Sequence, residues 1–112
     1  LLELHVAEEA TKYGMTCQEC DEMLAKANWK ALKYVHISGV MCMASNVDDT
    51  QRIRADFKMA YDFFNHAKDT YFTEDPQFCE RSYGMTHDYK IALEESPTLV
   101  RIGTRIFGER EY

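Results

Sequence analysis

Hydrophobic and polar positions change period along this chain, and the changes predict strands that alternate with helices. Residues 50–71 form the clearest predicted helix, because apolar residues recur there every three or four positions and define one face that must be buried. Residues 35–44 form a nearly continuous apolar run, as expected for a strand buried on both faces. The other predicted strands are residues 1–6, 78–85 and 98–103, and the other predicted helices are residues 16 to about 28 and 88–95.

The repeated order of strand and helix predicts an α/β fold with a parallel sheet and right-handed crossovers. A (β/α)8 barrel of about 250 residues uses about 31 residues for each βα unit, so this chain of 112 residues corresponds to roughly 3.6 units. The chain also begins inside an apolar strand pattern, Leu1-Leu2-Glu3-Leu4. We therefore expect residues 1–112 to form one partial domain of four βα units, about half of a TIM-type barrel.

Glycine and hydroxyl-bearing residues follow the last two predicted strands. Ligands bind at the carboxyl ends of strands in α/β proteins, and the loops after the last two strands of a barrel often build a phosphate site. Gly84 and Gly103 would let backbone N–H groups approach an anion, and Thr86 and Thr104 have hydroxyl groups that can donate to it. These segments predict the phosphate-binding end of a barrel.

Arg101 stands among apolar residues of the last predicted strand, where a charge is costly without a partner. Alternation along the strand places Arg101 and Leu99 on one side of the sheet, which is the lumen in a barrel. Two interpretations remain open from the residues alone. Arg101 either contacts a ligand or forms an ion pair with Glu80 or Asp88 that serves packing.

The same segments resemble the pyridoxal-phosphate homeostasis proteins, the YggS-like group that shares its barrel with the alanine racemase N-terminal domain. That family has Ser-Met-Gly-Met-Ser and then Thr-Met-Val-Arg-Ile-Gly-Thr-x-Ile-Phe-Gly. The matches here are Ser82, Gly84, Met85, Asp88, residues 100–104 and residues 106–108. Residues 9–14 and 37–41 also resemble the family's Glu-x-x-Lys-x-Gly loop and Ile-x-Gly-Leu-Met strand. The resemblance covers the whole chain and the second half of the family's length, which implies the C-terminal half of the barrel.

The resemblance implies that the cofactor is pyridoxal 5′-phosphate (PLP). Arg101 would then lie against the pyridine nitrogen, and Thr86 and the Gly103-Thr104 pair would hold the phosphate. Ser82, Gly84 and Met85 complete the expected cofactor-binding residues. The family's Schiff-base lysine lies at the end of the first barrel strand, which this chain lacks, so we expect non-covalent binding. Lys12 follows a strand, but a loop charge paired with Glu8 or Glu9 is the simpler interpretation.

The function implied by this resemblance is PLP binding in intracellular PLP homeostasis, without enzymatic activity and in the cytoplasm. A racemase-like PLP enzyme and a degenerate half-barrel without a ligand are the alternatives. The net charge of −6 argues against nucleic acid or an anionic membrane as a partner, and no stretch is long enough to span a membrane. Four strands leave two open sheet edges, at residues 1–6 and 98–103, which predicts self-association.

Three residues depart from the family pattern around the predicted site. Arg81 replaces a leucine whose side chain should face the helix layer, where an unpaired guanidinium would cost several kcal/mol, roughly. Tyr83 replaces methionine, and Arg105 replaces a small residue beside the phosphate loop, where it either strengthens or obstructs an anion site. His87 is near the expected phosphate, but a loop histidine is usually solvated.

The pair Cys17-Gln-Glu-Cys20 invites a redox or zinc interpretation, but a structural one fits better. Thr16 and Glu19 have the spacing of a helix capping box, so both cysteines fall inside a helix and form its buried stripe with Leu24. No second pair with ligand spacing completes a tetrahedral site. We therefore expect reduced, structural cysteines.

Overall fold

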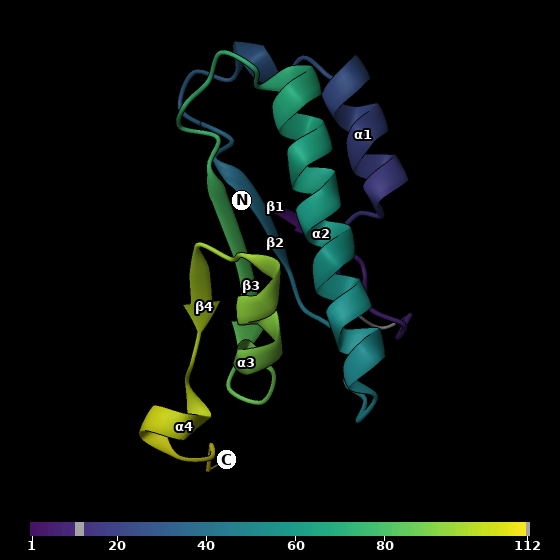
Figure 1. The fold of residues 1–112 in the computed structure, drawn as a ribbon. Helices are drawn as coiled ribbons and strands as arrows, with labels where there is room; N and C mark the ends of the chain where they lie inside the picture. Colours follow the sequence, from purple (N-terminus) through teal and green to yellow (C-terminus); the bar gives the residue numbers. More distant parts are fainter. Residues whose placement is uncertain (11–12, 112) are drawn as a thin grey trace.

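The computed structural model describes residues 1–10 and 13–111. The strands are β1 (Leu2–Leu4), β2 (Gly39–Cys42), β3 (Glu80–Met85) and β4 (Leu99–Arg101), and the α-helices are α1 (Cys17–Lys26), α2 (Thr50–Tyr71), α3 (Tyr89–Ala92) and α4 (Thr104–Phe107). Two short 3-10 turns, η1 (Trp29–Ala31) and η2 (Leu93–Glu95), follow α1 and α3. The strands pair in parallel in the order β1-β2-β3-β4, which confirms the predicted α/β alternation. Helices α1 and α2 run side by side, while α3 lies beside β3 and α4 follows the end of β4 (Figure 1).

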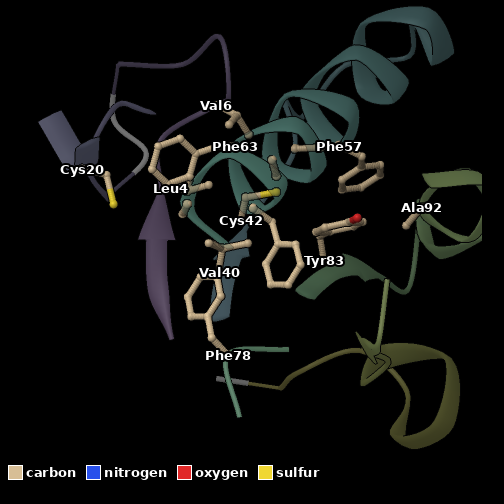
Figure 2. Close-up of a cluster of buried hydrophobic side chains, with 14 of the residues drawn as sticks. Leu4, Val6, Cys20, Val40, Cys42, Phe57, Phe63, Phe78, Tyr83 and Ala92 are labelled. Atoms are coloured by element: carbon tan, nitrogen blue, oxygen red, sulfur yellow. The ribbon is translucent and has the colours of Figure 1, made fainter. Parts of the chain in front are cut away.

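The hydrophobic core lies between the sheet and α2 (Figure 2). Leu4, Val40, Cys42 and Tyr83 come from three strands, and each is at most 1% exposed. Phe57 of α2 stacks on Tyr83 with 5.3 Å between ring centroids. The apolar stripe predicted for residues 50–71 therefore packs against the sheet and holds the strands in place.

The opposite face of the sheet is only partly covered. The strand register joins Glu3, Met41, Ser82 and Leu99 in one row, and alternation along each strand turns this row away from the core. Leu99 is 47% exposed on this face. Arg101 follows Leu99 by two positions and so belongs to the same face, which corresponds to the lumen of a barrel.

Helix α1 has the predicted capping box. The Thr16 hydroxyl accepts from the Glu19 N–H, and the Glu19 carboxylate accepts from the Thr16 N–H, each at 3.1 Å. Cys20 and Leu24 are buried and Cys17 is half-buried, so the predicted stripe is confirmed, and all four cysteines are free. Burial raises the pKa of the Cys20 thiol to about 12, which keeps it protonated. The helix ends at Lys26, two residues before the predicted end.

The strands are shorter than the apolar pattern predicted. The prediction that residues 35–44 form one strand buried on both faces is wrong at its start, because Val35 is 59% exposed and β2 begins at Gly39. Pairing with β3 limits β2, since the register starts with Gly39 opposite Glu80. The Ser38 carbonyl accepts from the N–H groups of Cys79 and Glu80 at 3.0 and 2.9 Å, and these two bonds close that end of the sheet.

The outer edge of β1 is covered at its carboxyl end, so the prediction of an open edge along residues 1–6 is wrong there. Met15 returns to this edge, where its N–H donates to the Glu3 carbonyl at 2.9 Å and its carbonyl accepts from the His5 N–H at 2.7 Å. Gly14 makes the return possible, because its φ of 106° suits glycine and an added Cβ would lie 2.8 Å from the Glu3 carbonyl oxygen. Among the described residues, β4 alone keeps an outer edge without a neighbouring segment.

Candidate functional site

A pocket of about 350 Å³ opens at the carboxyl ends of β3 and β4. Four of the residues that we expected to bind the cofactor line it: Met85, Thr86, Gly103 and Thr104. They come from two separate loops that the parallel pairing of β3 and β4 brings together. The volume lies in the range of about 300–1,000 Å³ that is typical of small-molecule sites.

A hydrogen bond ties the two loops of this pocket. The Gly103 N–H donates to the Thr86 hydroxyl oxygen at 3.1 Å. Since a hydroxyl that accepts still has its own proton, Thr86 can donate to an anion in the pocket. The Gly103 N–H, which we expected to approach the anion, is used within the protein in this conformation.

Asp88 holds the β3–α3 loop in shape. Asp88 is buried, and one carboxylate oxygen accepts from the Met85 N–H at 2.7 Å, while the Asp88 N–H donates to the Met85 carbonyl at 3.1 Å. The other carboxylate oxygen lies 3.3 Å from Nε2 of His87. These two hydrogen bonds between Met85 and Asp88 close a turn, which holds Thr86 and His87 at the mouth of the pocket.

Ser82 and Gly84 do not line the pocket. Ser82 is buried within β3, and Gly84 lies against α3 with a φ of 108°. A Cβ added to Gly84 would be 2.8 Å from the Cβ of Ala92, so glycine is needed for α3 to pack on β3. Close packing of the helix therefore accounts for this glycine, and a contact of either residue with the cofactor stays a prediction.

Arg101 reaches across the end of the sheet. Its Nη2 donates to the carbonyl of Cys42 at 3.0 Å. Arg101 is the last residue of β4 and Cys42 is the last residue of β2, so the side chain crosses the end of β3, which lies between these two strands. Its Nε is buried and has no hydrogen-bond partner among the described residues. Glu80 instead accepts from the Thr98 hydroxyl, and Asp88 is held by Met85, so neither forms the ion pair that the packing interpretation required. Arg101 thus has donor capacity that the described part of the protein does not use.

Two departures from the family pattern are accommodated away from the pocket. Arg81 faces the helix layer as predicted, where its guanidinium lies 4.8 Å from the Phe64 ring centroid and its Nε donates to the Ser96 carbonyl at 2.7 Å. Tyr83 donates its hydroxyl to the Glu95 carbonyl, and burial raises the pKa of this phenol, which therefore keeps its proton. The expected cost of an unpaired Arg81 is avoided because the charge has partners.

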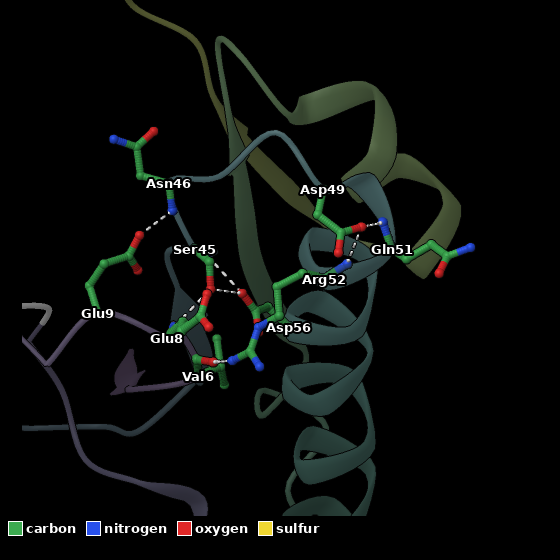
Figure 3. Close-up of polar contacts among 9 residues, drawn as sticks. All are labelled: Val6, Glu8, Glu9, Ser45, Asn46, Asp49, Gln51, Arg52 and Asp56. Atoms are coloured by element: carbon green, nitrogen blue, oxygen red, sulfur yellow. Dashed lines mark hydrogen bonds and ion pairs between the residues drawn. The ribbon is translucent and has the colours of Figure 1, made fainter.

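A second polar cluster joins the carboxyl ends of β1 and β2 (Figure 3). Asp56 of α2 is fully buried and accepts from the N–H and the hydroxyl of Ser45 at 2.8 and 2.6 Å, while Ser45 accepts from the Glu8 N–H at 2.8 Å. Nε of Arg52 lies 3.0 Å from Asp56, and its Nη2 donates to the Val6 carbonyl at 3.1 Å. We call these five residues the Asp56 network. The network joins the loop between β1 and α1 to the loop between β2 and α2, at the same end of the sheet as the pocket.

Lys12 lies outside the described residues, and so does its expected pairing with Glu8 or Glu9. The Glu9 carboxylate accepts from the Asn46 N–H at 2.6 Å. Within residues 1–10 and 13–111, no group of three or more histidine, cysteine or acidic side chains is arranged to hold a metal ion. No helix in the same ranges has the length and apolarity to cross a membrane.

Curated proteins with similar sequences share one description. The pyridoxal phosphate homeostasis protein of Aquifex aeolicus is 31% identical over 112 residues, which are 100% of this chain and 47% of that protein. The protein of the same description from Pasteurella multocida is 31% identical over 113 residues, or 100% of this chain and 46% of its own length. The chain is therefore similar to the C-terminal part of these pyridoxal phosphate homeostasis proteins. It spans about half the length of these curated relatives, and no family model matches it.

Solved structures show the same similarity. PipY of Synechococcus elongatus PCC7942, solved without PLP, superimposes with a TM-score of 0.81 and 27% identity over 96% of this chain and 48% of its own. The PLP-bound structure of PipY gives a TM-score of 0.74 and 26% identity over 95% of this chain and 49% of its own. The α/β fold with four parallel strands, expected as half of a TIM-type barrel, is therefore confirmed.

Four lining residues were not among the expected site residues. They are His87, Phe107, Gly108 and Arg110. Gly108 belongs to the segment that resembles the family, and His87 adjoins Thr86, so proximity along the chain was an available signal for both. Arg110 lies two residues beyond that segment, and only the turn of α4 brings it back to the pocket. Arg105, whose effect was left open, is exposed and does not line the pocket.

Proposed function

We propose that this chain is the PLP-binding C-terminal part of a cytoplasmic protein of PLP homeostasis, and that it binds the cofactor without catalysing a reaction. The single observation that carries the proposal is the pocket where Thr86, Gly103 and Thr104 meet. The relatives named for PLP homeostasis and the PLP-bound structure of PipY support the choice of ligand.

The residues of the pocket fit a phosphate group. Thr86 and Thr104 have hydroxyl groups that can donate to phosphate oxygens, and Met85 forms part of the wall. None of the lining residues has a carboxylate, which would repel the anion. Ser82 and Gly84 support the site less directly, by shaping β3 and its packing on α3.

Arg101 fits the opposite end of the cofactor. Its register partner is Met85, which lines the pocket, so its side chain starts beside the phosphate site on the face that corresponds to the lumen. The buried Nε without a partner is a donor that a ring nitrogen of the ligand could satisfy. The bond to the Cys42 carbonyl holds the guanidinium in this position.

This arrangement favours carriage over catalysis. PLP supplies a reactive aldehyde and a ring that accepts electrons. A guanidinium is effectively always protonated, so Arg101 can donate a hydrogen bond to the ring nitrogen but cannot accept a proton from it. The ring therefore stays neutral and is a weaker electron acceptor. Arg101 thus orients the cofactor without activating it.

An absorbance titration tests the proposal. PLP should bind the chain non-covalently and more tightly than pyridoxal, because pyridoxal lacks the phosphate that Thr86 and Thr104 would hold. Borohydride treatment followed by mass spectrometry should leave no stoichiometric adduct at one lysine. Equal affinity for PLP and pyridoxal would refute the phosphate site, and a single adduct would refute non-covalent binding.

Substitution of Arg101 separates a ligand role from a packing role. Arg101→Ala should weaken PLP binding by about 1–3 kcal/mol, the usual scale for a charge-assisted hydrogen bond. Arg105→Ala is the matched control, because Arg105 is exposed and does not line the pocket. Thermal melts of both variants show how far each one changes stability. If Arg101→Ala binds PLP as well as the parent and only melts earlier, Arg101 is a structural residue.

A further inference from the structure

The segment that leads into β2 combines positive charge with exposed apolar side chains in an acidic protein. Aspartate and glutamate make up 19 of the 112 residues, yet residues 23–47 contain three lysines and no acidic residue. Within this stretch, Leu32, Tyr34 and Val35 are 52%, 91% and 59% exposed. Exposed apolar side chains that gather beside charged ones are typical of a surface that binds another molecule.

A pocket of about 240 Å³ lies between this segment and Phe72, the residue that caps the end of α2. Trp29, Leu32, Val35 and Phe72 give it an apolar lining. Lys30 also lines it, with Nζ 5.5 Å from the centroid of the Trp29 ring. Since an apolar cavity of about 150 Å³ holds benzene, this volume suits one large apolar side chain. We call it the Trp29 pocket.

The aromatic wall of the Trp29 pocket is held in place within the protein. The ring centroids of Trp29 and Phe72 are 4.9 Å apart, and Nε1 of Trp29 donates to the Leu24 carbonyl at 2.9 Å. Phe72 stacks in turn on the buried Phe78, with 3.9 Å between ring centroids. A rigid wall loses little conformational freedom when a partner binds, so more of the contact energy contributes to affinity.

Asp75 is the one acidic residue among the described residues that line the Trp29 pocket, and its carboxylate already has partners. Oδ2 lies 2.8 Å from Nε2 of His36, and Oδ1 accepts from the Gln77 N–H at 3.0 Å. Nζ of Lys68 donates to the Asp75 carbonyl. Asp75 therefore opposes an anionic partner less than a free carboxylate would, and the lysines determine the sign of the charge around the pocket.

The position of the Trp29 pocket separates it from the cofactor pocket. The Trp29 pocket lies beyond the starts of β2 and β3, whereas the cofactor pocket opens at the carboxyl ends of β3 and β4 (Figure 1). Strand β2 has β1 and β3 as neighbours, so the Trp29 pocket is also away from the outer edge of β4. A partner bound there leaves both the cofactor pocket and that edge accessible.

We propose that the Trp29 pocket docks an acidic peptide segment of a partner protein, with one large apolar side chain in the pocket and carboxylates beside Lys30 and Lys33. Charge complementarity selects this occupant, because the surrounding segment is basic and free of acidic residues. An anionic membrane fits less well, since it would meet the net charge of −6 of the whole chain. The proposal does not depend on PLP binding.

The fluorescence of Trp29 tests the proposal, because it is the one tryptophan of the chain and it lines the pocket. The probe is the synthetic peptide acetyl-Glu-Asp-Glu-Leu-Phe-Glu-Asp-amide, titrated into the whole chain at low salt. One control peptide replaces Leu-Phe by Ser-Ser, and the other replaces every acidic residue by lysine. The probe should shift the Trp29 emission to saturation, and neither control peptide should do so at the same concentrations.

Two variants with matched controls test the residues. Lys30→Glu should weaken probe binding by about ten-fold, the scale of reversing one charge about 4 Å from a carboxylate in water-like surroundings. Lys90→Glu makes the same charge change on α3 and should keep the parent affinity. Leu32→Ser should weaken binding by about five-fold, the scale of one partly buried aliphatic contact. Leu93→Ser, at a 59% exposed position of η2, should not.

All four positions are exposed, so the variants should fold like the parent, which circular dichroism checks. Absence of a response to the probe, or equal binding of the lysine peptide, overturns the proposal. Equal losses in the variants and their controls place the contact elsewhere and overturn it too. A response of Trp29 to vesicles of equal phosphatidylserine and phosphatidylcholine, but not to the probe, identifies a membrane as the occupant instead. An emission that changes with protein concentration alone identifies a second copy of the chain.

Discussion

Removing the buried carboxylate of Asp56 should destabilise the protein more than removing any exposed acidic group of α2. The variant Asp56→Ala deletes two hydrogen bonds from Ser45 and leaves that N–H and hydroxyl buried without an acceptor. It also leaves Arg52 without its ion-pair partner, but Arg52 is 38% exposed, so water compensates part of this loss. Unsatisfied buried groups cost about 1–3 kcal/mol each. We expect a total loss of about 3 kcal/mol in the free energy of unfolding.

Urea denaturation followed by circular dichroism measures this loss, and the melting temperature should fall by about 10–15 °C. Asp62→Ala is the matched control on the same helix, because Asp62 pairs with Lys58 and both side chains are about 60% exposed. Such exposed pairs contribute about 0.3–0.5 kcal/mol. Asp56→Asn keeps one acceptor oxygen for Ser45 and should lie between the two.

A loss below about 1 kcal/mol for Asp56→Ala would refute the reasoning, since it would mean that the Asp56 network is solvated rather than buried. A loss as large in the Asp62→Ala control would point instead to a general dependence on the charge of the helix. The expected order of stability is therefore parent, Asp62→Ala, Asp56→Asn and then Asp56→Ala.

Two further predictions concern the sheet edge and the acid range. We expect the chain to self-associate through the open edge of β4, which size-exclusion chromatography would detect. Leu99→Lys should shift the chain toward the monomer. Leu93→Lys is the control, because Leu93 is exposed on η2 and this variant should not change the association. Hydrogen bonds from His66 and Tyr71 hold the pKa of Asp21 below its usual range, so the stability from this carboxylate is fully present above about pH 4 and is lost as the pH falls through the lowered pKa. Asp21→Asn should make the free energy of unfolding depend less on pH in this acidic range. The same decrease in the parent and in Asp21→Asn would contradict the prediction.

The sequence predicted the elements whose residues repeat with a clear period. Residues 50–71 have the period of a helix and are α2, and the capping box at Thr16 starts α1 at the expected residue. The length of β2 was wrong because an apolar run shows that residues tend to be buried, whereas the length of a strand depends on its neighbours. Here Glu80 of β3 begins the pairing, and the residues before Gly39 have no strand to join.

Part of the candidate site was also accessible from the sequence. Thr86, Gly103 and Thr104 could be expected together because parallel strands end at one edge of a sheet. Arg110 could not, because its position depends on the turn of α4, which no periodic pattern marks. The Asp56 network was missed for a similar reason: a carboxylate on the apolar face of a helix shows its role only when Ser45 is seen beside it.

The return of Met15 to β1 makes the two borders of the sheet unequal as templates for further strands. A strand that arrives beside β4 only has to form new hydrogen bonds. A strand that arrives beside the end of β1 must first break the two bonds between Met15 and the backbone of Glu3 and His5, which costs about 0.5–1.5 kcal/mol for each bond. We therefore expect assembly with complementary strands to begin at β4 and to reach β1 later, because only the edge of β1 has bonds that must first break.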